Sequence, residues 1–291
     1  MGKKFVLSQE DGTVAGGNAR GDGAVDLQIT RTNANEVASG NYSVVLGGES
    51  NRAAQTGSVV IGGRINQCTG TNSVAGGDNS NVSGNASIGI GSDLIVSGAN
   101  ATAFGRTNTA SSQYSTVSGG QSNTASSDTH ATVVGGQSNT ASGLHATVIG
   151  GNIVNATGSK SIAGGRSSNA SGTAAVALGF FSNSQGASSM ALGQEVVAQT
   201  NYSFVTGYQV EAYLYGQQVF GSGSLNNSAS SQQSFLTARR QASLTTGGTT
   251  VLSLDGTGVT NLIIPYQTNR AWNVQVNWVA VVTAITGTAT G

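Results

Sequence analysis

The chain has 291 residues, only 8% of them charged, and lysine plus arginine equal aspartate plus glutamate at 12 each, so the formal net charge is zero. With basic and acidic residues equally few and scattered, no electrostatic field is expected to attract nucleic acid or an anionic membrane surface. The single cysteine, Cys68, excludes an internal disulfide framework, and with His130 and His145 it is too little for a zinc site, so we expect no metal and no cofactor.

Residues 1–39 contain most of the charge clusters. The opening apolar run of three residues, 5–7, is too short for a secretory signal, and no window approaches the length of a membrane-spanning helix. We therefore expect synthesis in the cytoplasm without export by the usual route and without membrane insertion. We interpret residues 13–17 as an irregular first coil that acts as a cap. The RGD at 20–22 is more simply a chance match than an integrin ligand.

Residues 40–223 repeat a short apolar run that ends in glycine. The spacing between these glycines is 14, 15 or 16 residues, which is typical of a solenoid. Such a repeat is too short for a helical pair and fits two short strands with two tight corners, so each repeat predicts one coil of a parallel β-roll. The closing glycines are Gly47, Gly62, Gly76, Gly91, Gly105, Gly119, Gly135, Gly150, Gly164, Gly179, Gly193, Gly207 and Gly221.

Small or β-branched residues stand two positions before each closing glycine, as a narrow roll interior requires. These are Val45, Val60, Val74, Gly89, Ala103, Val117, Val133, Val148, Ile162, Ala177, Ala191, Val205 and Val219. The residues one position before the glycine point to the opposite face and are also mostly apolar. Strands apolar on both faces are buried on both faces, so we expect this second face to pack on other copies of the chain around a rotation axis. The interface candidates are Leu46, Ile61, Ile90, Phe104, Val134, Ile149, Leu178, Leu192 and Phe220.

Five positions before the closing glycine, five coils carry a ring: Tyr42, Tyr114, His130, His145 and Tyr202. Because Tyr114, His130 and His145 fall on three successive coils, we predict that their rings stack as a ladder. One hypothesis makes this ladder a contact strip for a glycan or protein receptor. The alternative is ordinary corner packing, which every solenoid needs.

Threonines also align, three positions before the closing glycine, at Thr102, Thr116, Thr132 and Thr147. A flat threonine array is one route to ice binding. Since this column lies on the face assigned to chain packing, we interpret the threonines as interface residues.

No catalytic residue is predicted. The acids Glu49, Asp78, Asp93, Asp128, Glu195 and Glu211 lie mostly at expected corners, where solvated charges are common. A glycan-degrading tailspike would need a carboxylate pair, which a cleft between chains would have to assemble. Cys68 lies in a corner segment and is interpreted as a reduced structural thiol.

After residue 223 the period stops. We expect a polar connector over 224–249 and a small antiparallel β domain over 250–291, incomplete or completed by the other chains of an oligomer. Apolar and polar residues alternate strictly over 272–280, which indicates a strand with one buried and one wet face. Trp272 and Trp278 of this strand are further receptor-contact candidates.

The segments SVVIGGRINQCTG, AVALGFFSNSQG and SMALGQEVVAQ resemble the head repeats of trimeric autotransporter adhesins. The resemblance covers about residues 40–223. It implies left-handed parallel β-rolls, three of which pack side by side into an adhesive head. The expected fold is therefore an all-β, left-handed parallel β-solenoid of about 13 coils, homotrimeric, with the small antiparallel domain at its C-terminus.

The export signal, heptad stalk and membrane anchor of that family have no counterpart in the sequence. We therefore expect a non-enzymatic bacteriophage fibre, located in the virion as a tail or head fibre, that binds a host-surface glycan or protein. Residues 1–39 would join it to other virion proteins, and residues 17–43 resemble the leader of phage-encoded fibres. The alternative is a bacterial surface adhesin, with a tailspike or an ice-binding solenoid as lesser alternatives.

Overall fold

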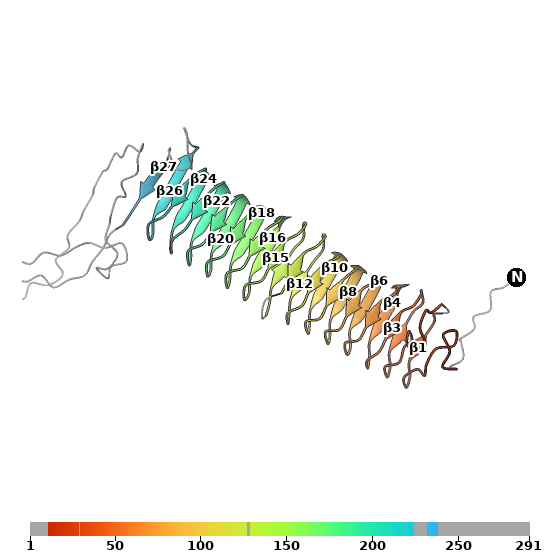
Figure 1. The fold of residues 1–291 in the computed structure, drawn as a ribbon. Helices are drawn as coiled ribbons and strands as arrows, with labels where there is room; N and C mark the ends of the chain where they lie inside the picture. The colour runs from red at the N-terminus through yellow and green to blue at the C-terminus, as the bar shows by residue number, and fades with distance from the viewer. Residues whose placement is uncertain (1–10, 29, 127–128, 224–231, 238–291) are drawn as a thin grey trace, which may run out of the picture.

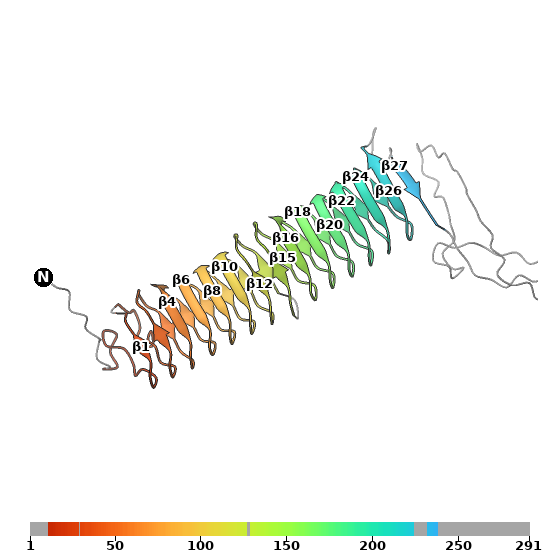
Figure 2. The same cartoon turned by 180° about the vertical axis from the view of Figure 1, so that it is seen from behind.

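The computed structural model describes residues 11–28, 30–126, 129–223 and 232–237. Over these residues the chain winds into a rod-shaped parallel β-solenoid of about 13 turns and contains no helix (Figure 1 and, from behind, Figure 2). Two sheets run along the rod, one of 15 strands (sheet A) and one of 12 strands (sheet B). The predicted all-β solenoid is confirmed.

Each coil between the two ends of the rod contributes one strand to each sheet and pairs with the next coil in parallel. In spatial order, sheet A consists of β1 (Val25–Asp26), β2 (Val44–Val45), β4 (Val59–Arg64), β6 (Val74–Asp78), β8 (Ile88–Ser92), β10 (Thr102–Arg106), β12 (Thr116–Val117), β14 (Thr132–Val133), β16 (Thr147–Asn152), β18 (Ile162–Arg166), β20 (Val176–Phe180), β22 (Met190–Gln194), β24 (Phe204–Tyr208), β26 (Gln218–Ser222) and β27 (Gln232–Phe235). Sheet B consists of β25 (Glu211–Ala212), β23 (Val197–Ala198), β21 (Asn183–Ser184), β19 (Asn169–Ala170), β17 (Asn155–Ala156), β15 (Thr140–Ala141), β13 (Thr124–Ala125), β11 (Thr109–Ala110), β9 (Ile95–Val96), β7 (Asn81–Val82), β5 (Gln67–Cys68) and β3 (Arg52–Ala53).

The interior is a narrow column of valine and alanine between the sheets, as the sequence predicts. The prediction is wrong for two positions of the interior column. Val74 is only partly buried and Ile162 is 39% exposed. The residues that follow them, Ala75 and Ala163, are fully buried and occupy the interior instead. The cause is one extra residue in each of the preceding strands, β4 and β16, where a bulge shifts the register. A fixed count back from the glycine is therefore off by one in these two coils. Cys68 lies in the interior column, fully buried and free.

One corner of the roll, between sheet A and sheet B, holds a ladder of buried asparagines. In the central coils it consists of Asn108, Asn123 and Asn139, each 0% exposed. The Asn123 amide nitrogen donates to the carbonyl oxygens of Gly119 and Gly136, both at 3.0 Å. The second bond joins two coils, and Gly136 O also accepts the backbone N–H of Gln121 from the same coil as Asn123.

Both corners also use left-handed backbone. Each has one residue per coil at a φ near 55°, and most of these residues are not glycine. Such a backbone is unfavourable for most L-residues, so the stacked neighbours impose it.

The N-terminal end is closed by buried charge. Asp26 accepts hydrogen bonds from Arg20 at 3.2 Å and Arg31 at 3.0 Å, and the Arg31 side chain is fully buried. The two arginines also donate to the carbonyl oxygens of Gly16 and Ala15, which hold the turn at 13–17 against the first coil. Sheet A therefore begins with β1, inside the segment 1–39 that we expected to precede the roll.

At the other end of the rod, β27 pairs antiparallel with β26. This strand lies inside the expected connector, 224–249. The expected C-terminal domain, with Trp272 and Trp278, lies outside the described residues.

Candidate functional site

The outer surface of sheet A is an apolar stripe. Every one of the nine interface candidates points outward from this sheet and is exposed or only partly buried; Leu46, Val134 and Ile149, for example, are 51–53% exposed. Because strand side chains alternate, the residues two positions earlier share this face. They form a second outward column, mostly of valine, isoleucine and threonine: Val44, Val59, Val74, Ile88, Thr102, Thr116, Thr132, Thr147, Ile162, Val176, Met190, Phe204 and Gln218.

Sheet B presents a different outer surface. From β11 to β19 its outward column is uncharged and polar, with Thr109, Thr124, Thr140, Asn155 and Asn169 in register. The two outer surfaces of the roll therefore differ: that of sheet A is apolar, and most of that of sheet B is polar. The asymmetry indicates that only sheet A has a surface suited to burial.

Three rings stack along the corner that leads from sheet B into sheet A. The ring centroids of Tyr114 and His130 are 4.8 Å apart with 19° between the planes, and those of His130 and His145 are 4.8 Å apart with 8° between the planes. The predicted ladder is confirmed. All three residues are exposed and have φ between 56° and 58°, which is the backbone of this corner throughout the roll. Tyr42 and Tyr202 occupy the same corner several coils away.

Beside the ladder, the second outward column of sheet A changes from aliphatic residues to threonine. Thr116, Thr132 and Thr147 each follow a ladder ring by two residues and lie in register on neighbouring strands of sheet A. In the coils nearer both ends of the roll, this column is mostly valine, isoleucine or methionine. The corner rings and the hydroxyl groups therefore share the same three coils and make one polar strip at the margin of the stripe.

Lys160 continues the ladder column one coil beyond His145. Its backbone N–H donates to Leu144 as that of His145 donates to Thr129, and its φ is 59°. Lys160 was not predicted from the sequence, because counting from Gly164 places Ser159 in the column. The bulge in β16 makes Gly165 the equivalent glycine.

The predicted corner acids stay dispersed over several coils, and Asp128 lies outside the described residues. Asp93 accepts hydrogen bonds from Asn79 and Ser92, which lower its pKa and favour the carboxylate over the protonated form a general acid needs. Within the described residues, no group of three or more His, Cys, Asp or Glu side chains is placed to hold a metal ion. No helix in the described part of the chain is long and apolar enough to cross a membrane.

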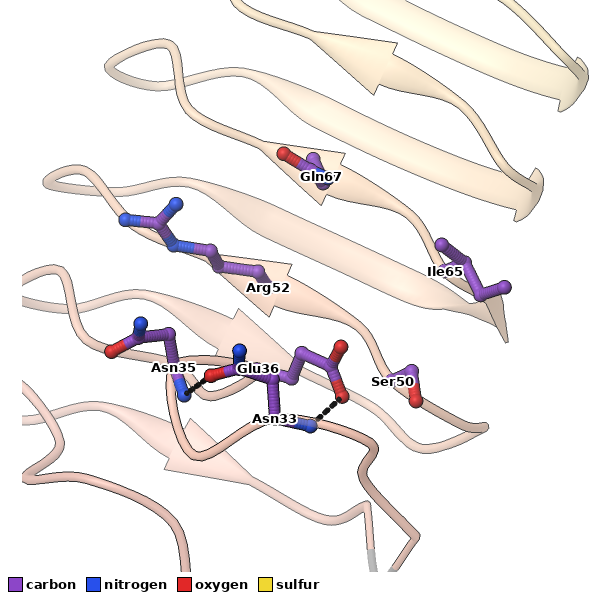
Figure 3. A pocket seen from close by; sticks show the side chains of 7 residues that line it. All are labelled: Asn33, Asn35, Glu36, Ser50, Arg52, Ile65 and Gln67. Carbon is purple, nitrogen blue, oxygen red and sulfur yellow. Dashed lines mark hydrogen bonds between the residues drawn. The ribbon is translucent and has the colours of Figure 1, made fainter. Parts of the chain in front are cut away.

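A shallow polar hollow of about 190 Å³ lies near the N-terminal end of sheet B (Figure 3). It is lined by Asn33, Asn35, Glu36, Ser50, Arg52, Ile65 and Gln67. The Glu36 carboxylate accepts hydrogen bonds from the backbone N–H groups of Thr32 and Asn33. Partial burial raises the pKa of Glu36, but these bonds and one from the Thr32 hydroxyl outweigh it, so the pKa is lowered. Glu36 therefore fastens the capping loop.

The fold and its surfaces define a fibrous structural protein: stacked coils, an apolar side and exposed corners. The YadA head domain repeat matches the chain twice, over residues 97–122 and 156–182. The chain thus contains adhesin head repeats, as the sequence resemblance indicated, and the first matched segment includes Tyr114. A search of curated proteins found no match.

Proposed function

We propose that the chain is the subunit of a homotrimeric, non-enzymatic bacteriophage fibre that attaches the virion to its host. The observation that carries the proposal is the apolar stripe on sheet A. At about 4.8 Å per coil, the stripe is roughly 60 Å long, with columns about 7 Å apart. An apolar surface of that extent is a protein interface in most water-soluble proteins.

Copies related by a rotation axis cover such a stripe most simply. Sheet A of each chain would face the axis, and the nine interface candidates would form the seam between chains. Heterologous contacts that close around an axis give a ring of defined size instead of an open polymer. The resemblance to adhesin heads favours three chains.

The Tyr114–His130–His145 ladder is the proposed receptor contact, for a glycan or protein of the host surface. It is exposed, and it is placed on a corner instead of in the seam. Trp272 and Trp278 remain receptor candidates. The segment 1–39 is the proposed attachment to other virion proteins.

A bacterial surface adhesin is the second candidate, because the matched repeat is that of an adhesin head. Peptide mass spectrometry distinguishes the two. Peptides of this chain in density-purified virions support the fibre, whereas peptides confined to the bacterial surface fraction support the adhesin.

The oligomer is tested by sedimentation equilibrium of the full chain. We expect the mass of three chains for the wild type and a loss of association for Leu178→Glu with Leu192→Glu, because these place charge in the seam. The matched control, Asn155→Glu, adds charge on the outer surface of sheet B and should leave the mass unchanged. A folded wild-type monomer would contradict the seam.

Host adsorption tests the ladder. We expect His130→Ser with His145→Ser to abolish binding to host cells while the trimer stays intact. Tyr42→Ser, which removes an exposed ring at the same corner but outside the ladder, should adsorb like the wild type. Normal adsorption of the double variant would remove the ladder from the proposal.

A further inference from the structure

We infer that the ladder and Lys160 bind the carboxylate or phosphate groups of an extended acidic polymer, and that acidification strengthens this binding. The inference rests on the proposed function, since it specifies the ligand of the same strip. It follows from three observations: which atoms of the rings are free, which charges surround them, and how the rings repeat along the rod.

Stacking determines which atoms can meet a ligand. His130 lies between Tyr114 and His145, so both faces of its imidazole are covered by rings about 4.8 Å away. A sugar ring therefore cannot stack on His130. The ring edges remain, and they carry hydrogen-bonding groups: the phenol O–H and the imidazole nitrogens. Recognition by His130 is consequently polar.

The strip is rich in donors. Lys160 adds an ammonium group at the His145 end of the column. No carboxylate belongs to the ladder column in these coils. Donors in a row, with no carboxylate in their column among the described residues, suit an anionic ligand, because charge-assisted hydrogen bonds are stronger than neutral ones.

The local charge depends on the two histidines. From residue 107 to 159 the sequence contains a single charged residue, Asp128, which lies outside the described residues two positions before His130. Tyr114 and Lys160 are the column neighbours of the two histidines, and Arg106 ends its strand at the far edge of sheet A. Histidine is the side chain that ordinarily gains charge between pH 8 and 5. Positive charge on His130 and His145 would make this nearly uncharged part of the roll a basic strip.

The repeat favours a polymer over a small anion. Ring centroids recur every 4.8 Å along the rod, on three successive coils. An extended chain lying parallel to the rod meets all of these edges, and Lys160 one coil further. The three strips of a trimer would add avidity if a polymer or a cell surface engages more than one of them.

The test uses the full-length protein and immobilised polygalacturonate, with fully methyl-esterified pectin as its uncharged match and polyphosphate as the phosphate arm. Binding is measured by biolayer interferometry at pH 5.5 and 7.5 at constant ionic strength. We expect binding to polygalacturonate, polyphosphate or both that is roughly three- to tenfold tighter at pH 5.5, as two added surface ion pairs allow. The methyl ester should bind at neither pH. A preference for one of the two anionic polymers identifies the anionic group.

His130→Asn with His145→Asn should abolish the pH dependence. Asparagine tolerates the left-handed backbone, so the variant is expected to fold, and its sedimentation mass checks this. Lys160→Gln should weaken binding at both pH values while keeping their ratio. Ser188→Asn, at the same corner outside the ladder, is the control and should match the wild type.

Three results would overturn the inference: equal affinity at both pH values, equal affinity for the methyl ester, or no binding to either anionic polymer. Host adsorption separates these from a failure of the proposed function. If the ladder is needed for adsorption but the protein does not bind acidic polymers, the proposed ligand class is wrong and the attachment role of the ladder stands. If adsorption does not need the ladder, the attachment role of the strip is wrong.

Discussion

The backbone N–H of Asn139 donates to the side-chain Oδ1 of Asn123, one coil earlier, at 3.0 Å. The same Asn123 side chain donates to two carbonyl oxygens, those of Gly119 and Gly136. One buried amide thus bonds three backbone groups on two successive coils. Since a buried backbone group without a partner costs about 1–3 kcal/mol, the asparagine ladder helps to hold neighbouring coils in register.

Asn123→Ala should therefore destabilise the roll by about 1–3 kcal/mol, because it removes the side-chain acceptor of the buried Asn139 N–H and one of the two donors to each carbonyl oxygen. Thermal unfolding followed by circular dichroism measures the change. Asn123→Ser is the control: Ser182 occupies the equivalent position in a later coil, where its hydroxyl contacts the carbonyl oxygens of Leu178 and Gly193. We expect the serine variant to lose less stability than the alanine variant. Equal losses would show that the amide contacts contribute little.

Glycines differ sharply in how they tolerate a side chain. A Cβ on Gly77 would overlap the carbonyl oxygen of Gly91 in the next coil, and Gly77 has φ of 103°. A Cβ on Gly135 meets nothing within 4 Å. Gly77→Ala should cost about 3 kcal/mol or more through overlap and backbone strain, and Gly135→Ala should cost little. Their unfolding midpoints provide the comparison, and similar midpoints would contradict this coil spacing.

Two ion pairs of similar length should contribute very differently. Asp26→Asn removes the charge that faces the fully buried Arg31, which should destabilise the N-terminal end by about 3–5 kcal/mol. Asp78→Asn breaks a pair with Arg64 in which both side chains are about half exposed, and we expect no resolvable change. Limited proteolysis near the N-terminus and thermal unfolding measure both. Equal behaviour of the two variants would mean that the cap is not closed by buried charge.

Ile153 is a β-branched, 53% exposed residue with φ of 58°. Asparagine accepts this backbone more readily, so Ile153→Asn should raise stability by about 1 kcal/mol. Ser167→Asn, at the equivalent corner position one coil later, is the control and should change stability less. A fall in the unfolding midpoint of the Ile153 variant would instead reveal that a neighbouring copy buries this side chain.

Burial raises the pKa of the Cys68 thiol, and the hydrogen bond with Ser73 only partly offsets it. The thiolate is the reactive form of cysteine, so Cys68 should resist alkylation by iodoacetamide in the folded protein. It should be alkylated fully in guanidinium chloride. Intact-mass spectrometry measures both, and rapid modification without denaturant would place Cys68 outside the core.

Periodicity was sufficient to predict the solenoid, because each coil solves the same packing problem with the same few residue types. The ladder was predictable for the same reason: Tyr114, His130 and His145 recur at the period, and parallel stacking converts a period into contact. The apolar outer face of sheet A was likewise visible as apolar residues on both sides of Val45 and Val60.

The tertiary structure decided what periodicity leaves open. A single extra residue in a bulge reverses which side chain points inward, so only the register showed that Ala75 and Ala163 are interior and that Lys160 extends the ladder. Asp26, Arg20 and Arg31 close the N-terminal end. Because this arrangement occurs only once, no periodic pattern in the sequence predicts it. The sequence by itself thus determined the repeating architecture, because that depends on local spacing and side-chain size. The bulges and the cap depend on contacts between particular coils, and only the folded chain defines those.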